Sequence, residues 1–163
     1  MDLTAGQKAP RLTVSLSGGR TATIPAVGRP QLLFFFKVAC PTCPLAAPSV
    51  EQLRRGYSQA PTPLDVLCVA QDEPEETSTW MRENGLAGEV AFDGPFFPAS
   101  AAFGLLVVPS LVLIDAQGGI VATEEGFSRD GYNALSLAAS RLTGAPYWPV
   151  AGPGDGRPAF RPG

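Results

Sequence analysis

Runs of apolar residues, separated by glycine and proline, divide this chain into short predicted strands and helices. The segment 31–37 carries an uninterrupted apolar run. This predicts a buried central strand, because a strand with one solvated face would alternate apolar and polar residues. A second buried strand is predicted at 64–70. Further strands are expected at 12–16, 21–24, 89–92, 110–115 and 120–125.

Helices are predicted between and after these strands. A helix at 41–57 starts with Pro41, whose missing N–H costs nothing at the first helical position, and contains Pro48, which predicts a kink. A helix at 74–84 is expected to have Asp72 as its N-cap, because its carboxylate can accept from free N–H groups. Two more helices are expected, at 97–103 and 129–142.

The order of these elements predicts an α/β fold, with a mixed central β-sheet flanked by helices and an N-terminal β-hairpin. Alternating strands and helices in the middle imply parallel strands, whereas the closing hairpin implies antiparallel ones. The 163 residues are enough for one domain, which we place at 1–145. Residues 146–163 are rich in proline and glycine with few core residues, so we expect an extended or disordered tail.

Composition excludes several classes of partner. The net charge is −3 and no run of like charges is present, so neither nucleic acid nor a membrane surface is an expected partner. The longest apolar runs are too short to span a bilayer. The N-terminus has no basic region followed by an apolar core, so we expect no signal peptide and a cytoplasmic location.

The chain has three cysteines and no histidine. Three cysteines exclude a disulfide-rich scaffold, and a closed zinc site needs about four nitrogen or sulfur ligands, so no metal and no cofactor are expected. The absence of histidine removes Cys–His and Ser–His catalysis. Cys68 lies in the predicted strand at 64–70 and is expected to be a buried small hydrophobe.

The other two cysteines form the motif Cys40-Pro41-Thr42-Cys43, between the central strand and the following helix. Two cysteines three apart at a helix start can close a disulfide with little backbone movement, and the helix N–H groups stabilise a thiolate. We therefore predict that Cys40 is an exposed nucleophile with a pKa below about 8.5 and that Cys43 is the resolving thiol. The alternative is a static surface disulfide or an inert pair.

Several motifs together resemble the thioredoxin-like superfamily, and within it the redoxin or TlpA-like thiol–disulfide oxidoreductases related to the AhpC/TSA peroxiredoxins. The apolar strand, the dithiol motif and Pro48 are similar to that family's active-site strand and kinked helix. The segment 105–110 resembles its loop with a cis proline, 115–119 its D-x-x-G hairpin, and 6–10 the start of the redoxin branch. The resemblance covers about residues 5–143.

This resemblance implies a thioredoxin-like fold and a thiol–disulfide oxidoreductase. Its substrates would be protein or small-molecule disulfides, and a cellular dithiol reductant would recharge it. It also implies that Pro109 follows a cis peptide bond and that the Val108 backbone faces the sulfurs, although an X–Pro bond is usually trans. Pro41, Thr42, Val108 and Pro109 would then form the substrate-binding surface.

The chain departs from the family pattern around the dithiol. Ala39 stands where a typical thioredoxin has tryptophan, Phe34 where it has a buried aspartate, and Ala46 near the place where TlpA-like reductases often have glutamate. The usual carboxylate proton acceptor is therefore missing at both expected positions, and another group or water must take the proton. Lys37 is the nearest cation in sequence and either tunes the thiolate or is simply solvated.

Two other functions are kept open. Residues 38–42 resemble part of the peroxiredoxin active site, which suggests a thiol peroxidase with Cys40 as the peroxidatic thiol. That family has Thr or Ser three residues before its reactive cysteine and a proline further upstream, where this chain has Lys37 and Leu33. The third alternative is a non-catalytic thioredoxin-fold binding module.

Overall fold

The computed structural model describes Met1 and residues 3–163. Its main sheet is mixed and has the strand order β2-β1-β5-β4-β3-β6-β7, with β3–β4 and β4–β5 parallel and the other pairs antiparallel. The predicted α/β fold with a mixed central sheet and an N-terminal hairpin is confirmed. The strands are β1 (Leu12–Leu16), β2 (Thr21–Ile24), β3 (Gln31–Phe36), β4 (Asp65–Ala70), β5 (Glu89–Phe92), β6 (Ser110–Ile114) and β7 (Ile120–Glu125).

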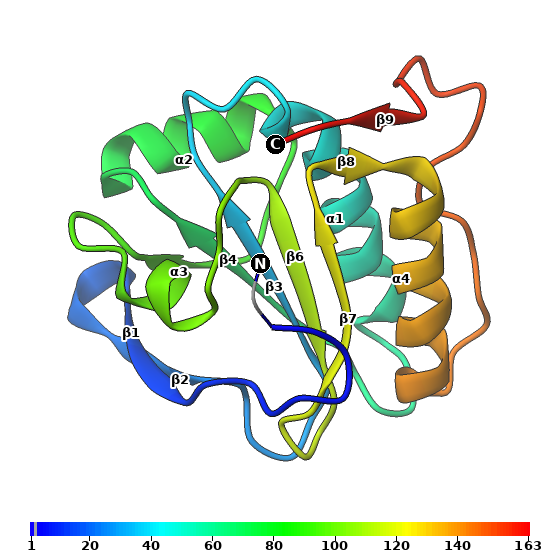
Figure 1. The fold of residues 1–163 in the computed structure, drawn as a ribbon, viewed down its shortest axis with the longest axis horizontal. Coiled ribbons are helices and arrows are strands. Elements are labelled where there is room, and N and C mark those ends of the chain that lie inside the picture. Colours follow the sequence, from blue (N-terminus) through cyan, green and yellow to red (C-terminus); the bar gives the residue numbers. More distant parts are fainter. Residues whose placement is uncertain (2) are drawn as a thin grey trace.

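The α-helices of the described residues pack on this sheet: α1 (Cys43–Tyr57), α2 (Pro74–Glu83), α3 (Pro98–Ala102) and α4 (Arg129–Thr143). Figure 1 shows α1 and α4 side by side. The first helix begins two residues later than predicted, because Pro41 and Thr42 form a bend and Pro44 takes the place in the first turn that needs no N–H. Among the described residues, no helix is long and apolar enough to cross a membrane.

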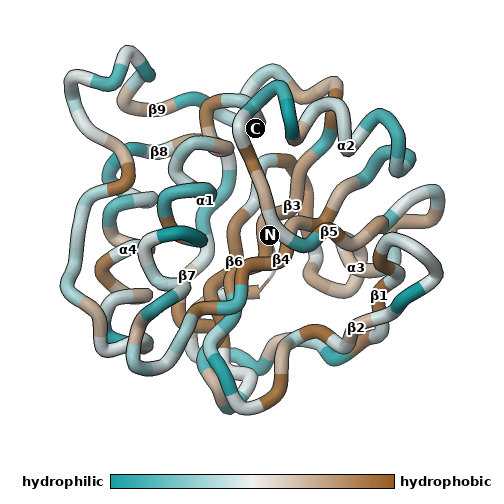
Figure 2. Tube along the Cα trace, turned by 180° about the vertical axis from the view of Figure 1, so that it is seen from behind, coloured by the Kyte–Doolittle hydropathy of each residue, from teal (hydrophilic) through white to brown (hydrophobic). Residues whose placement is uncertain are grey.

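The continuous apolar run of β3 is explained by cover on both faces of the sheet. Leu32, Phe34 and Phe36 join a core cluster with side chains of α1, α2 and α4. Leu33 and Phe35 face the opposite cluster, which includes α3 and the N-terminal hairpin. Figure 2 shows the hydrophobic residues concentrated along β3, β4 and β6. This strand is therefore rigidly held at the end where the dithiol motif begins.

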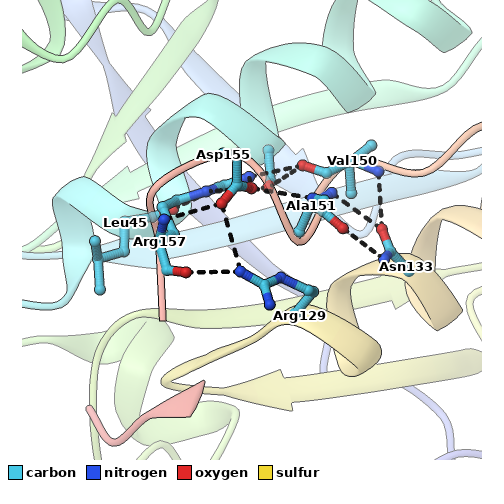
Figure 3. Close-up of polar contacts among 9 residues, drawn as sticks. Leu45, Arg129, Asn133, Val150, Ala151, Asp155 and Arg157 are labelled. Carbon is cyan, nitrogen blue, oxygen red and sulfur yellow. Dashed lines mark hydrogen bonds and ion pairs between the residues drawn. The ribbon is translucent and has the colours of Figure 1, made fainter. Parts of the chain in front are cut away.

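The segment after α4 differs from the expected tail. It packs on the body: Val150 and Ala151 are buried in the core cluster. The Asn133 side chain of α4 accepts from the N–H groups of Val150 (2.9 Å) and Ala151 (3.0 Å) and donates to the Ala151 carbonyl (2.7 Å), as Figure 3 shows. The expectation of a disordered tail with few core residues is therefore wrong.

A second, unpredicted sheet lies at the end of the chain. It consists of β8 (Phe127–Ser128) and β9 (Phe160–Arg161), which pair antiparallel. Figure 1 shows β9 running beside β8 toward the start of α1, where the label of the C-terminus lies. The two-residue strands bring the last part of the chain to the same end of the molecule as the dithiol motif.

Candidate active site

The dithiol motif lies in the connection from the carboxyl end of β3 to α1. The Cys40 N–H donates to the Lys37 carbonyl (3.1 Å), which turns the chain after β3. The Cys43 N–H then donates to the Cys40 sulfur at 3.0 Å. Because Cys43 is the first residue of α1, this is one of the helix N–H groups without an intrahelical partner. The sulfur of Cys40 thus sits where a helix start favours negative charge, as predicted from the spacing.

Cys40 is less accessible than the sequence suggested. The expectation of an exposed nucleophile is wrong, because only 9% of Cys40 is exposed. On one side its thiol donates to the Val108 carbonyl at 3.3 Å. On the other side, Pro162 accepts a hydrogen bond from Thr42 of the dithiol motif and Gly163 lies against Val108 of the proline loop.

The two thiols differ strongly in acidity. A hydrogen bond from the Cys43 thiol, helped by the N–H groups of Thr42 and Cys43 and by the charge of Arg161, lowers the pKa of Cys40 to about 6 against the opposing effect of burial. Burial, followed by the hydrogen bond to Cys40, raises the pKa of Cys43, whose side chain is fully buried. The pair therefore combines one reactive thiolate with one protected thiol.

The predicted proline loop closes the other side of the site. The peptide bond between Val108 and Pro109 is cis, as the resemblance implied. The N–H of Gly126 donates to the Pro109 carbonyl (2.8 Å), and the Ser110 hydroxyl donates to the Val107 carbonyl (2.7 Å). These bonds fix the loop so that its Val108 carbonyl faces Cys40.

The remaining predicted site residues lie around the dithiol in different environments. Pro41 and Lys37 are exposed. Thr42 is 2% exposed, and its hydroxyl donates to the Pro162 carbonyl at 2.7 Å. The cation that lowers the pKa of Cys40 is Arg161 of β9, which the sequence did not single out because it lies in a segment expected to be a tail.

Asp72 is a second residue whose place was not predicted. It does not cap α2, where Glu73 is the N-cap; instead its carboxylate accepts from the Val38 N–H at 2.6 Å. Its charge also contributes to the raised pKa of Cys43, after burial and the bond to Cys40. The sequence could have predicted this position of Asp72, because β3 and β4 are parallel and the residues that follow them meet at one edge of the sheet. The Asp72 carboxylate is thus held against the loop that leads from β3 to the dithiol motif.

The third cysteine is outside the site. Cys68 in β4 is 1% exposed, and burial raises the pKa of its thiol to about 12. This confirms the prediction of a buried residue. In the part of the chain that the structure describes, no group of three or more His, Cys, Asp or Glu side chains could hold a metal ion.

The fold and the paired cysteines define the thioredoxin-like class of thiol–disulfide oxidoreductases. Within that class the AhpC/TSA family model matches residues 5–123, and the chain belongs to the AhpC/TSA family. A comparison with curated proteins gives no match.

Solved structures show the same fold. A protein from Chlorobium tepidum, described as the thiol:disulfide interchange protein DsbE, is 22% identical with a TM-score of 0.77 over 87% of this chain and 99% of its own. One described as a thioredoxin from Neisseria meningitidis is 28% identical, with a TM-score of 0.67 over 81% and 90%. A secreted disulfide oxidoreductase from Mycobacterium tuberculosis is 18% identical, with a TM-score of 0.66 over 80% and 96%.

Proposed function

We propose that this protein exchanges disulfides by cycling Cys40 and Cys43 between a dithiol and a disulfide. The observation that carries the proposal is the Cys43 N–H placed 3.0 Å from the Cys40 sulfur at the start of α1. That contact, together with the unequal acidities of the two thiols, gives each cysteine a separate role. Cys40 is the attacking group and Cys43 the resolving group.

The reaction follows from these roles. The Cys40 thiolate attacks one sulfur of a substrate disulfide, a Cys40–substrate bond forms, and the other substrate sulfur leaves as a thiolate that takes up a proton. Cys43 then gives up its proton and attacks the Cys40 sulfur. The Cys40–Cys43 bond forms, the second substrate sulfur leaves, and two electrons have passed to the substrate. As the group that receives the Cys43 proton we propose the Asp72 carboxylate, which the Val38 N–H holds in the loop before the dithiol motif.

Substrates and partners are proposed on the chemistry of the site. We propose protein or small-molecule disulfides as substrates and a cellular dithiol as the reductant, with the nearby Val108 backbone as a binding surface. The cytoplasmic location stays a prediction, since the Mycobacterium tuberculosis neighbour is described as secreted. Immunoblotting of fractionated host cells would decide between the two locations.

Reduction of insulin by dithiothreitol, followed as turbidity, tests the proposed function. The wild-type protein should accelerate the reaction, and Cys40→Ser should abolish the acceleration. Cys43→Ser should retain the attack and accumulate a mixed disulfide with insulin, visible on a non-reducing gel. Equal turbidity rates with wild type, Cys40→Ser and no protein would overturn the proposal.

A thiol peroxidase is the second candidate, and the match to the AhpC/TSA family favours it. The lowered pKa of Cys40 suits attack on peroxide as well. Lys37 and Leu33 nevertheless occupy the places where the peroxiredoxin pattern has a hydroxyl residue and a proline. Peroxide consumption with a dithiol donor, compared between wild type and Cys40→Ser, separates this activity from disulfide exchange. Inactivity in both assays would instead indicate a binding module.

A further inference from the structure

Residues 159–163 cross the dithiol site and are called the C-terminal strap below. The strap is aligned by β8: Arg161 pairs with Phe127, Phe160 pairs with Ser128, and the Arg129 N–H donates to the Ala159 carbonyl at 2.9 Å. Figure 1 shows this short strand leading toward the start of α1. The pairing directs the following two residues, 162 and 163, onto the site.

Those two residues contact the two segments that flank Cys40, the dithiol motif and the proline loop. The Pro162 carbonyl accepts from the Thr42 hydroxyl at 2.7 Å. Gly163 is so close to the proline loop that a Cβ atom there would lie 2.7 Å from the Val108 carbonyl oxygen. Thr42 and Val108 belong to the predicted substrate-binding surface. The strap therefore fills the place at which an extended substrate would meet Cys40.

The path of the strap is also shaped by the turn before β8. Gly126 has a φ of +72°, and a Cβ atom there would lie 2.6 Å from the Arg161 carbonyl oxygen. Its own N–H donates to the Pro109 carbonyl. One glycine thus touches the proline loop with its N–H and leaves room for the strap at its α-carbon.

Arg157, two residues before the strap, is anchored much more firmly. The Arg157 guanidinium donates to the Leu45 carbonyl (2.7 Å) and the Ser49 hydroxyl (2.8 Å) of α1 and to the Val150 carbonyl (3.0 Å). It also pairs with Asp155 and lies 4.9 Å from the centre of the Phe127 ring. Figure 3 shows how this side chain ties the segment to α1. The anchor can hold while the strap beyond it moves.

The strap itself is held by few contacts. In the described part of the chain, its pairing in regular structure is limited to the two-residue strand β9, and all of residues 158–163 are exposed. The side chain of Phe160 points largely into solvent, with 62% of the residue exposed. A segment with so few buried contacts and so many exposed backbone groups is expected to open locally without unfolding of the domain.

We propose that the strap is a displaceable cover that holds the place of a polypeptide substrate over Cys40. This deepens the proposed function and rests on it for the identity of the displacing partner, an extended polypeptide that carries a disulfide. In the closed state the strap shields the Cys40 thiolate from small oxidants and alkylating agents. The rate at which Cys40 reacts with such reagents is then limited by the fraction of molecules in which the strap is open.

Alkylation of Cys40 tests the cover without depending on enzyme activity. A variant that ends at Pro158 keeps the Arg157 anchor and loses the strap. Iodoacetamide at about pH 8.5, where a thiol with a pKa of about 6 is ionised, should modify its Cys40 about tenfold faster or more than in the full chain, as expected for a minor open state. Mass spectrometry identifies the alkylated cysteine. An unchanged rate would overturn the proposal.

The matched control is Arg161→Gln, which removes the charge near Cys40 and keeps the strap. It should raise the pKa of Cys40 and leave the alkylation rate at about pH 8.5 close to that of wild type. If this variant reacts as fast as the truncated one, the charge rather than the cover controls access and the proposal is wrong.

Substitutions at Thr42 keep the test decisive if the truncated variant does not fold. Thr42→Val in the full chain should speed alkylation, whereas Thr42→Ser, which keeps the hydroxyl bonded to Pro162, should not. With a folded truncated variant, a peptide of residues 157–163 at millimolar concentration should slow alkylation, because a tethered segment has an effective concentration on the order of millimolar. A scrambled peptide should have no effect.

The same variants separate a failure of the cover from a failure of the proposed function. Faster alkylation of the truncated variant, with no insulin reduction by either protein, would leave the cover standing and refute the disulfide exchange. Insulin reduction by both the full chain and the truncated variant, with equal alkylation rates of Cys40 in the two proteins, would refute the cover alone. Faster alkylation together with faster insulin reduction would support both.

Discussion

Trp148 stacks on Tyr57, with the ring centroids 4.8 Å apart and the ring planes 12° apart. The stack joins the segment after α4 to the last turn of α1, and the Tyr57 hydroxyl donates to the Ser136 carbonyl of α4 at 3.0 Å. Gly56 lies beneath the indole, and a Cβ atom there would come within 2.7 Å of the Trp148 Nε1 atom. A glycine is accommodated inside this helix because the aromatic ring takes the space of its side chain.

The first prediction concerns this pair. Gly56→Ala should destabilise the protein by about 1–2 kcal/mol, because the clash with Trp148 outweighs the gain of about 0.5–1 kcal/mol in helix propensity. In a Trp148→Ala background the same change should stabilise by about 0.5–1 kcal/mol. Denaturant unfolding of the four proteins measures both effects. If Gly56→Ala changed the free energy of unfolding in the same direction in both backgrounds, the indole would not rest on α1.

A second prediction concerns the acidity of Cys40. The largest contribution to its low pKa is the hydrogen bond from the Cys43 thiol, so Cys43→Ala should raise the pKa of Cys40 above its value of about 6. Cys43→Ser keeps a donor at the same place and should leave the pKa below that of the alanine variant. The backbone N–H of residue 43 remains in both variants, so neither pKa should reach the ordinary value of about 8.5.

The pH dependence of iodoacetamide alkylation at Cys40 measures these pKa values. Cys68→Ala, carried in every variant, removes the only cysteine outside the dithiol. Equal pKa values for wild type and Cys43→Ala would contradict the assigned cause.

A third prediction links the pKa of Cys40 to stability. Its native pKa of about 6 lies below the unfolded value of about 8.5, so between these pH values the native state has lost a proton that the unfolded state still carries. Unfolding then takes up a proton, and the stabilisation is full above about pH 8.5 and is lost as the pH falls toward 6. The slope should be at most about 1.4 kcal/mol per pH unit.

Urea unfolding of the reduced protein and of Cys40→Ser, at several pH values between about 5 and 8.5, isolates this contribution. The difference in unfolding free energy should change in favour of wild type as the pH rises. The oxidised protein has no free thiol at position 40 and serves as the control. A difference that stays constant across the range would mean that the native pKa of Cys40 is ordinary.

A fourth prediction concerns Asp72. Asp72→Ala leaves the Val38 N–H without its acceptor and should cost about 1.5–3 kcal/mol of stability, the usual range for a hydrogen bond to a charged group. Asp72→Asn keeps an oxygen acceptor and should cost less. Both changes remove a negative charge and should lower the pKa of Cys43.

Thermal or urea unfolding gives the stability of the two Asp72 variants. Trapping of the insulin mixed disulfide in a stopped-flow experiment gives the rate at which Cys43 resolves it. Slower resolution in Asp72→Asn, at nearly unchanged stability, would show that the carboxylate receives a proton. Unchanged resolution in both variants would assign Asp72 to the structure of the loop alone.

The strands, the helices and the position of the dithiol could be predicted from the amino-acid sequence. The apolar run of β3, the glycine turns of the two hairpins and the helix after Cys40 are each encoded within a few residues, and strand and helix periods reveal them. The family resemblance added the cis bond before Pro109. The position of Asp72 near the end of β3 could have been predicted in the same way, because parallel neighbouring strands end at one edge of the sheet.

The accessibility of the site, in contrast, depends on long-range contacts that the sequence does not reveal. Thr42 and Pro162 are 120 positions apart, and the burial of Cys40, the charge of Arg161 and the anchor at Arg157 all depend on contacts of that range. Such contacts leave no period or motif in the chain, because they depend on where a segment without regular structure finds hydrogen-bond acceptors and apolar surface after the domain has folded. The proline- and glycine-rich composition of that segment carried no information about the surface on which it lies.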